Sequence, residues 1–422
     1  MAMADQPAGK SFRLSMLLYD TRYRSMTIQF IMLALFVFGV FWLLNNMYTN
    51  LAAANKNPDF AFLSSTAGYD INQRLIEYTS QSTNARAWLV GLLNTLLVAF
   101  LGCILATVIG ISVGVLRLSK NWIVARLMTV YIEIFRNVPV LLWIVFLNAI
   151  LSETLPQPKD FKGVDAVASM SFWDTVIISN RGIFVPEPVF LSGSSIMLYV
   201  LLASIVGIFA FGRWARTDQE TTGRILPTFW IKLAIFVVPT LIVYFMMGQP
   251  IDWKLPAFEG RGAIGPDGVA YTKGIFRIDA DNGIHIRRSL IALCLALSLY
   301  TAAFIAEAVR AGIMAIDKGQ SEAAGALGLR QNRVMSLVVL PQALRVIIPP
   351  LISQYLNLTK NSSLAIAVGY MDVAGTLGGI TLNQTGRALE CILLLMITYL
   401  TISLSISLVM NLYNNSVKLK ER

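Results

Sequence analysis

The sequence predicts an all-α polytopic membrane protein with about eight transmembrane helices. Of its 422 residues, 56% are hydrophobic and only 14% are charged, whereas an average soluble domain is about 45–50% apolar and about 25% charged. The mean hydropathy is +0.63. Its apolar runs are continuous rather than alternating, which disfavours a β-barrel. This composition excludes a disordered chain and disfavours a soluble enzyme.

Eight stretches are long and apolar enough to cross a bilayer, for which a helix needs about 20 residues. They span residues 27–47, 88–116, 122–151, 195–213, 229–248, 289–311, 340–369 and 390–413. The first could be read as a secretory signal peptide, because the small residues Ala52, Ala53 and Ala54 follow it. Its apolar stretch is too long and its leader too extended for that reading, so we expect a retained helix.

The distribution of charge predicts how the chain is oriented. Lys+Arg 34 and Asp+Glu 24 give a net charge of +10, and an even number of spans places both termini on one side. With the N-terminus inside, more than half of the basic residues fall on the shorter inner segments, as the positive-inside rule requires. Arg287 and Arg288 are exceptions, because they lie on the outer side. The excess of basic residues on the inner segments is explained by membrane lipid headgroups, so we do not expect nucleic acid as a partner.

Residues that commonly carry catalysis are scarce in this chain. Its three cysteines fall inside apolar spans, at Cys103, Cys294 and Cys391, where they are expected to be small buried hydrophobic residues. His285 is the single histidine, so zinc sites and Ser–His–Asp triads lack their ligands. Gly9-Lys10-Ser11 resembles the end of a P-loop, but the first glycine is missing. We therefore expect no enzyme activity, metal or cofactor in this chain, and an energy source outside it.

The polar inner segment 312–341 predicts a short helix outside the membrane. Asp317 followed by Gln320 resembles a capping box, Ala323 and Ala324 favour helix, and Gly328 can end the helix in a left-handed conformation. Such a helix would have about ten residues and a length of about 15 Å. Taken alone, it could also be a linker between two spans.

The spacing within this segment resembles the cytoplasmic loop of binding-protein-dependent ABC transporter permeases. The resemblance rests on Glu322-Ala323-Ala324, on Gly328 and on Leu340-Pro341. It implies that the helix docks in a cleft of a separate ATPase subunit, which would hold ATP and magnesium, and transmits its closure. A carboxylate near the helix N-terminus is favoured by the helix dipole and can pair with a cation of the partner. The predicted coupling residues are Asp317, Gln320, Glu322, Ala323, Ala324, Gly328, Leu340 and Pro341.

Two further stretches resemble amino-acid permeases of the polar amino acid uptake family, which includes histidine and glutamine permeases. One is Tyr131-x-Glu133-x-x-Arg136-x-x-Pro139, and the other is 354–364. The insertion between them resembles the larger permease of general L-amino acid importers (Aap/Bzt type). The resemblance implies a type I ABC importer permease core with an inserted helix pair, in the bacterial inner membrane with both termini cytoplasmic. It also implies three partners: a homologous permease subunit in a heterodimer, a cytoplasmic ATPase dimer and a periplasmic amino-acid-binding protein.

We divide the chain into four segments on this basis. Residues 1–87 hold the tail, the first helix and an outer segment, and 88–151 form the first half of the permease core. Residues 152–288 are the insertion with two extra helices and two outer loops. Residues 289–422 form the second half with the coupling loop 312–341. A local β-hairpin is expected around the β-prone run 275–278 of the second outer loop.

Polar residues inside the spans are candidates for the substrate pathway, because charges there are costly. Glu133 and Arg136 share a helix face and can pair, either as a structural pair or as a gate. The patch 360–363 follows Pro349-Pro350 and either binds a zwitterion at a broken helix or holds helices together. Gly110 and Gly114 are expected to form a packing face. The predicted pathway residues are Asn94, Thr95, Glu133, Arg136, Gln354, Asn357, Lys360, Asn361, Ser362 and Ser363.

These patterns predict the permease subunit of an ABC importer that moves L-amino acids and is driven by a separate ATPase. The alternative is an ion-coupled secondary amino-acid transporter, which usually carries carboxylates or histidines in its spans. Glu133 is nearly the only candidate for that role. A membrane-embedded enzyme lacks a nucleophile or metal constellation.

Overall fold

The computed structural model describes residues 21–53, 59–162, 166–264, 270–279 and 282–417. The chain divides after Ser65 into two units, which we describe separately. The first holds the long helix α2 (Thr21–Ala53) and the 3-10 turn η1 (Ala61–Ser64). Most side chains of α2 are apolar and exposed. Such a surface suits a helix surrounded by lipid.

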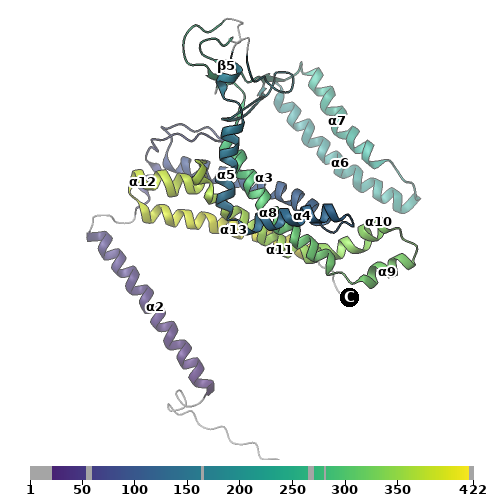
Figure 1. The fold of residues 1–422 in the computed structure, drawn as a ribbon, viewed down its shortest axis with the longest axis horizontal. Coiled ribbons are helices and arrows are strands. Elements are labelled where there is room, and N and C mark those ends of the chain that lie inside the picture. The colour runs from purple at the N-terminus through teal and green to yellow at the C-terminus, as the bar shows by residue number, and fades with distance from the viewer. Residues whose placement is uncertain (1–20, 54–58, 163–165, 265–269, 280–281, 418–422) are drawn as a thin grey trace, which may run out of the picture. The chain divides into compact units, whose positions relative to one another are not determined.

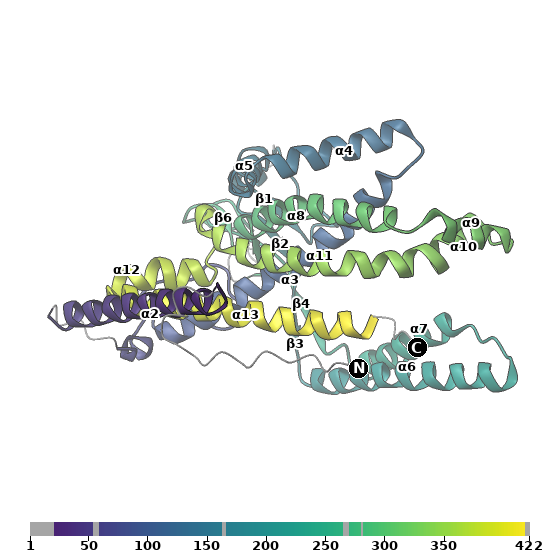
Figure 2. The same cartoon turned by 90° about the horizontal axis from the view of Figure 1, so that it is seen from below.

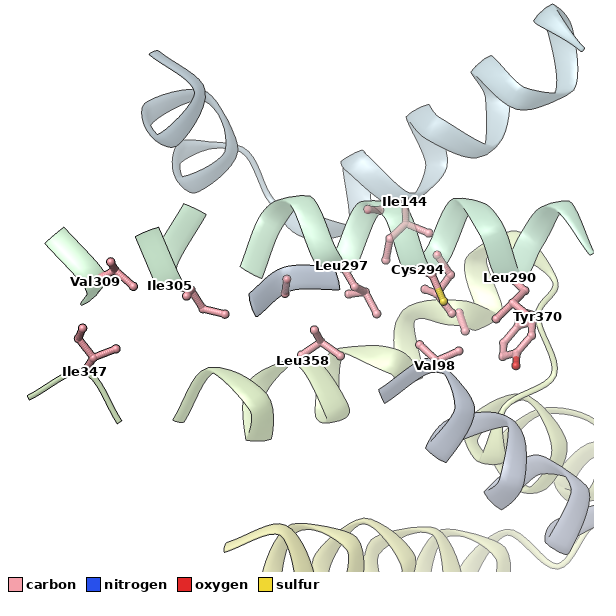
Figure 3. Packing of buried hydrophobic residues seen from close by; sticks show 14 of the residues in the cluster. Val98, Ile144, Leu290, Cys294, Leu297, Ile305, Val309, Ile347, Leu358 and Tyr370 are labelled. Carbon is pink, nitrogen blue, oxygen red and sulfur yellow. The ribbon is translucent and has the colours of Figure 1, made fainter. Parts of the chain in front are cut away.

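The second unit is a helical bundle centred on α8 (Arg288–Met314). Helix α3 (Asn84–Leu116) packs along α8, and α11 (Leu340–Asn361) lies beside both (Figures 1 and 2). Figure 3 shows Leu290, Cys294 and Leu297 of α8 directed toward Val98 of α3 and Leu358 of α11. These side chains belong to one buried apolar cluster. The core of the second unit is therefore the junction of these three helices.

Eight helices in the described part of the chain are long and apolar enough to cross a membrane. They are Tyr23–Ala53, Asn84–Leu116, Val140–Phe161, Ser194–Thr222, Thr228–Met246, Arg288–Met314, Gln331–Val368 and Ala388–Asn414. The last lies in α13 (Ala388–Val417). The predicted fold class and number of spans are confirmed.

The predicted span 122–151 is wrong as a single helix. The structure has α4 (Trp122–Asn137) and α5 (Val140–Thr154), which run in different directions (Figure 1). Pro139 disfavours the helical conformation of the residue before it. Val138 is accordingly extended, with φ −107° and ψ 133°. The local preference of the Val-Pro pair overrides the continuous apolar pattern.

The two outer loops form strand pairs with each other as well as within themselves. Strands β1 (Ile177–Ser179), β2 (Gly182–Val185) and β7 (Ile284–Arg287) form one antiparallel sheet. Strand β3 (Glu187–Phe190) pairs with β4 (Ile251–Lys254), and β5 (Phe258–Glu259) pairs with β6 (Arg277–Ile278). The β-prone run 275–278 therefore does contribute a strand, but its partner lies 18 residues upstream. The 3-10 turn η2 (Pro158–Phe161) contributes Phe161 to the apolar cluster below these sheets.

Helices α6 (Ser194–Thr222) and α7 (Thr228–Met246) are the predicted extra pair of the insertion. They pack chiefly against each other and are joined by a short turn that begins with Gly223 at φ +71°. Figure 1 shows them as an antiparallel hairpin. Their outer ends lead into β3 and β4, which are hydrogen-bonded to each other. The four-segment division of the chain stays a prediction.

Helices α3 and α8 approach each other closely at two glycines. A Cβ atom on Gly110 would lie 2.7 Å from Ile305 Cβ, and one on Gly114 would lie 2.8 Å from the Ala306 carbonyl oxygen. Real Cβ atoms do not tolerate such distances, so the backbones would have to separate. The predicted packing face Gly110–Gly114 is therefore observed, and α8 is the helix that it contacts.

Replacing Gly110 by valine should destabilise the bundle. Overpacking of this kind costs about 1–3 kcal/mol, which we expect to appear as a lower midpoint of thermal unfolding in detergent, followed by tryptophan fluorescence. Gly39→Val in α2 is the matched control, because a Cβ at Gly39 meets nothing within 4 Å. Equal midpoints for the two variants would show that the α3–α8 contact is less tight than it is described here.

Candidate functional site

The segment after α8 forms the predicted short helix, α9 (Lys318–Ala326). Asp317 is its N-cap, and Asp317 Oδ1 accepts a hydrogen bond from the Gly319 N–H at 2.7 Å. Gln320 donates its backbone N–H to the Asp317 carbonyl oxygen at 3.1 Å. Gly328 ends the segment at φ +80°, a conformation that favours glycine. Asp317 and Gly328 therefore mark the two ends of the helix as predicted, whereas no hydrogen bond from the Gln320 side chain within the described part of the chain completes the predicted capping box.

Helix α9 has one buried face and one exposed face. Ala324 is buried and packs with Val334 and Val339. Glu322 and Ala323 are exposed, and Leu327 is 83% exposed. Alanines on the exposed face allow a second protein to approach the helix backbone closely. The helix therefore presents a small apolar surface with one carboxylate.

The chain returns to the bundle through α10 (Gln331–Val334), the π-helical turn η3 (Met335–Val339) and then α11. Leu340 and Pro341 begin α11, and both are exposed. Proline is tolerated in a first turn because its missing N–H would have no intrahelical acceptor there. In Figure 2, α9 and α10 lie beyond the same end of α8 and α11. The predicted coupling residues therefore gather at one end of the bundle.

Helix α11 carries a polar stripe on an exposed face. Ser353, Asn357 and Lys360 are exposed, and spacings of four and three residues place them on one side of a helix. Gln354 and Asn361 are partly buried next to this stripe. The side chains of Ser362 and Ser363 donate to the carbonyl oxygens of Thr359 and Lys360, both at 2.8 Å. The serines are thus engaged within the chain, whereas the stripe is open.

Pro349 and Pro350, which precede the polar patch, do not interrupt the helix. Helix α11 continues through both prolines to Asn361, and the change to 3-10 geometry comes in η4 (Ser362–Val368). Gly369 then adopts a left-handed conformation at φ +69°. The interruption thus begins within the polar patch, at Ser362, rather than before it.

Asn94 and Thr95 lie on α3 in a buried polar network at its other end. Asn94 Nδ2 donates to the carbonyl oxygens of Gln73 and Met371, at 2.7 and 2.8 Å. Thr95 Oγ1 accepts from the Val373 N–H at 3.1 Å. Both side chains are fully buried. They tie α3 to the segment before η5 (Ala374–Thr381), and their predicted role as pathway residues stays a prediction.

The same network contains Asp372, a carboxylate that the sequence patterns did not single out. Its side chain is fully buried; Oδ1 accepts from the Gly375 N–H at 2.8 Å, and Oδ2 accepts from the Tyr399 hydroxyl at 3.0 Å. Burial raises its pKa to about 6, although these hydrogen bonds act in the opposite direction. Its position as the lone acid between the last two spans was the available signal in the sequence. Asp372 joins the segment before η5 to α13.

Glu133 and Arg136 do not form the predicted pair. Glu133 Oε2 accepts from Asn137 at 3.2 Å, and Arg136 lies over the ring of Phe304 at 5.3 Å from its centroid. Both charged side chains are exposed. Their spacing allowed a contact, but local and cross-helix partners compete for each of them.

An ion-pair cluster at the inner end of α3 and α8 was also missed. The guanidinium of Arg117 contacts Glu307 Oε2, and Arg310 Nη1 contacts Glu307 Oε1 at 3.0 Å. The side chain of Arg117 is only 16% exposed. This cluster joins the end of α3 to α8, seven residues before α8 ends at Met314. Since Arg117 and Glu307 are 190 residues apart, no local pattern could pair them.

An apolar cavity lies among the helices of the second unit. A cavity of about 630 Å³ opens between α3, α11 and α13. Its lining is almost wholly apolar, with Thr107 and Tyr355 hydrogen-bonded to each other at 2.6 Å. In the described part of the chain, no group of three metal-ligating side chains occurs. A bundle of membrane helices with one exposed, capped helix at its end defines an integral membrane protein that offers a small surface outside its spans.

Comparisons with known proteins identify the family of this membrane protein. Residues 221–419 match the family described as "Binding-protein-dependent transport system inner membrane component". The chain is 53% identical to "Glutamate/glutamine/aspartate/asparagine transport system permease protein BztB" of Rhodobacter capsulatus, covering 100% of both chains. It is 43% identical to "General L-amino acid transport system permease protein AapQ" of Rhizobium johnstonii, covering 98% of this chain and 96% of the relative. It is 42% identical to "Putative amino-acid ABC transporter permease protein YhdX" of Escherichia coli, covering 90% and 91%.

The chain belongs to the family of binding-protein-dependent ABC importer permeases. This membership confirms the resemblance that rested on Glu322-Ala323-Ala324 and Gly328. It also supports the importer over the ion-coupled secondary transporter. The chain is therefore a membrane-spanning permease subunit, and nucleotide hydrolysis is the task of another subunit.

Proposed function

We propose that the chain is a permease subunit for L-amino acids that include glutamate, glutamine, aspartate and asparagine. The observation that carries this proposal is the 53% identity to BztB over the full length of both chains, including the insertion. AapQ and YhdX, which are named for general and for amino-acid transport, are also similar over nearly the whole chain. The neutral Gln354 lies beside the polar stripe and provides no negative charge that would select substrates with cationic side chains. It therefore fits a broad range of amino-acid substrates.

Helix α9 is the proposed contact with a cytoplasmic ABC ATPase dimer, which holds ATP and magnesium. Glu322 and Ala323 lie on its exposed face, and Leu327 protrudes at its end. Ala324 packs against Val334 of α10 and Val339 of η3, the two turns that lead into α11. A displacement of α9 by the ATPase would therefore reach both α8 and α11, which are the helices that it connects.

The polar stripe of α11 is the proposed wall of the substrate pathway. Asn357 and Lys360 are exposed in this single chain, and exposed polar side chains on a membrane helix are stable only against another protein or a water-filled path. A homologous permease subunit opposite α11 would close that path. Gln354, Asn361, Ser362 and Ser363 border it, whereas Glu133 and Arg136 lie on α4.

The proposed orientation in the inner membrane places α9 and both termini in the cytoplasm. It rests on the excess of basic residues in the inner segments. A periplasmic amino-acid-binding protein would then deliver its substrate at the end of the bundle opposite α9. The two states of the pathway, open to one side or the other, would be selected by ATP binding and release in the ATPase.

The test is a reconstituted complex of this chain with its homologous permease and its ATPase in proteoliposomes. We expect ATP hydrolysis to rise when a binding protein loaded with glutamine is present, together with uptake that requires ATP. Uptake by this chain alone, driven by an ion gradient and without ATP, would overturn the proposal.

A further inference from the structure

Arg287 and Arg288 lie at the start of α8, at the end of the bundle opposite α9, where the positive-inside rule expects few basic residues. The structure accounts for Arg288. Its Nη1 donates to Ser152 Oγ at 2.7 Å and to the Asn180 carbonyl oxygen at 2.9 Å. Its Nε donates to Asn148 Oδ1 at 3.2 Å. Arg288 therefore joins α5, the β1–β2 turn and α8, which is a structural role.

Arg287 has no comparable set of partners for its side chain. It is partly buried, and its Nε is buried without a hydrogen-bond acceptor. The backbone N–H of Arg287 donates a hydrogen bond to Gln73 Oε1 at 3.2 Å. None of the ion pairs among the described residues includes it. A buried guanidinium N–H without an acceptor is unfavourable, and an anion from outside the chain would relieve that cost.

Two other arginines come to the same place from different segments. Arg181 is exposed at the β1–β2 turn, next to Gly182, which pairs with Arg287 across β2 and β7. Arg74 follows Gln73 in the outer segment; its Nη1 donates to the Tyr78 carbonyl oxygen at 2.6 Å and lies 3.7 Å from the exposed Asp70. Burial lowers the pKa of Arg287; Asp70 raises it, and Arg181 and Arg74 lower it. Three cations thus face a single acid.

The surroundings add to this positive charge rather than neutralise it. The N-terminus of α8 begins at Arg288, next to Arg287, and it carries a partial positive charge. His285 stacks on Phe184 with ring centroids 3.9 Å apart, and burial lowers its pKa to about 4. It is therefore neutral at pH 7 and neither adds to the cluster nor responds to pH there.

We propose that Arg287, with Arg181 and Arg74, forms a binding site for a carboxylate at the outer end of the permease. This inference rests on the proposed function, which supplies two sources of carboxylates: an acidic amino-acid substrate and an acidic side chain on the binding protein. Guanidinium groups bind carboxylates through two parallel hydrogen bonds. If the substrate supplies the carboxylate, the site would favour glutamate and aspartate over glutamine and asparagine. If the binding protein supplies it, the site would hold the loaded binding protein on the permease.

The test uses Arg287→Gln in the full complex, with glutamate and glutamine as separate substrates. If the substrate supplies the carboxylate, uptake of glutamate should fall about tenfold relative to glutamine, which is the value of one charge-assisted hydrogen bond. If the binding protein supplies it, both uptakes should fall equally. The affinity of the loaded binding protein for the complex should then also fall and become less sensitive to salt. An unchanged uptake ratio together with unchanged affinity would overturn the inference.

Control variants separate this inference from the proposed function and from folding. Arg261→Gln removes the same charge from an exposed position of the outer loops, and it should change neither readout. Arg181→Gln alters an exposed side chain and should reproduce the effect in part, even if Arg287→Gln does not assemble. Wild-type complex that fails to import glutamine with ATP would contradict the proposed function. Wild-type import with no effect in either arginine variant would contradict only the carboxylate site.

Discussion

Replacing Glu322 by alanine should abolish most ATP-driven uptake while leaving the permease folded. The Glu322 side chain is exposed, and no hydrogen bond or ion pair within the described chain involves it. Removing the Glu322 side chain should therefore change the stability of the isolated chain little. At an interface, truncating one partner of a buried charge pair costs about 2–5 kcal/mol, so we expect uptake to fall by a factor of about 30 or more. Stimulation of the ATPase by loaded binding protein should be lost with it.

The measurement compares uptake and ATPase activity in the same proteoliposomes. Glu220→Ala, at the end of α6, is the matched control, because Glu220 is also an exposed carboxylate, with 70% of its side chain exposed. Leu327→Ser tests the apolar part of the same surface and should weaken coupling without changing the fold. Normal uptake and normal ATPase stimulation in Glu322→Ala would show that Glu322 has no part in the contact with the ATPase.

The features predicted correctly are those that local sequence determines. A run of about 20 apolar residues is sufficient to define a span, and all eight spans were found. Helix α9 was found because its boundaries depend on Asp317 and Gly328, which act on backbone groups within a few residues. Gly110 and Gly114 were assigned to packing because only small residues allow close helix contacts.

The errors arise where distant segments decide the outcome. Strands β2 and β7 are about 100 residues apart in the chain, so their pairing could not be seen in either loop alone. Asn94 was considered for the substrate pathway because a polar residue in a span is unusual. Its amide nitrogen donates to the carbonyl oxygens of Gln73 and Met371, which come from two other segments, so these contacts could not be seen within its own span. The break at Pro139 is different, because the proline was visible and the long apolar run outweighed it.

The contact between Arg117 and Glu307 also joins distant segments of the chain, and its loss should have a large effect on stability. Glu307→Ala would leave the Arg117 guanidinium mostly buried without its counter-ion. Removing one partner of a hydrogen-bonded charge pair costs about 1.5–3 kcal/mol when the groups are partly buried. We therefore expect a clear fall in the midpoint of thermal unfolding of the purified complex. Arg310→Ala should have a smaller effect, because Arg310 is less buried than Arg117 and its contact with Glu307 is an i,i+3 pair within one helix, typically worth about 0.2–0.5 kcal/mol.

A double-mutant cycle distinguishes this ion pair from a general loss of packing. If Arg117 and Glu307 stabilise each other, Arg117→Ala combined with Glu307→Ala should destabilise the complex less than the sum of the two single changes. Additive effects would show that the two side chains act independently. Because α3 and α8 also touch through Gly110 and Gly114, the pair holds the inner ends of two helices that already pack closely. Loss of the pair should therefore loosen that inner end, from which α8 continues to α9, and weaken coupling as well as stability.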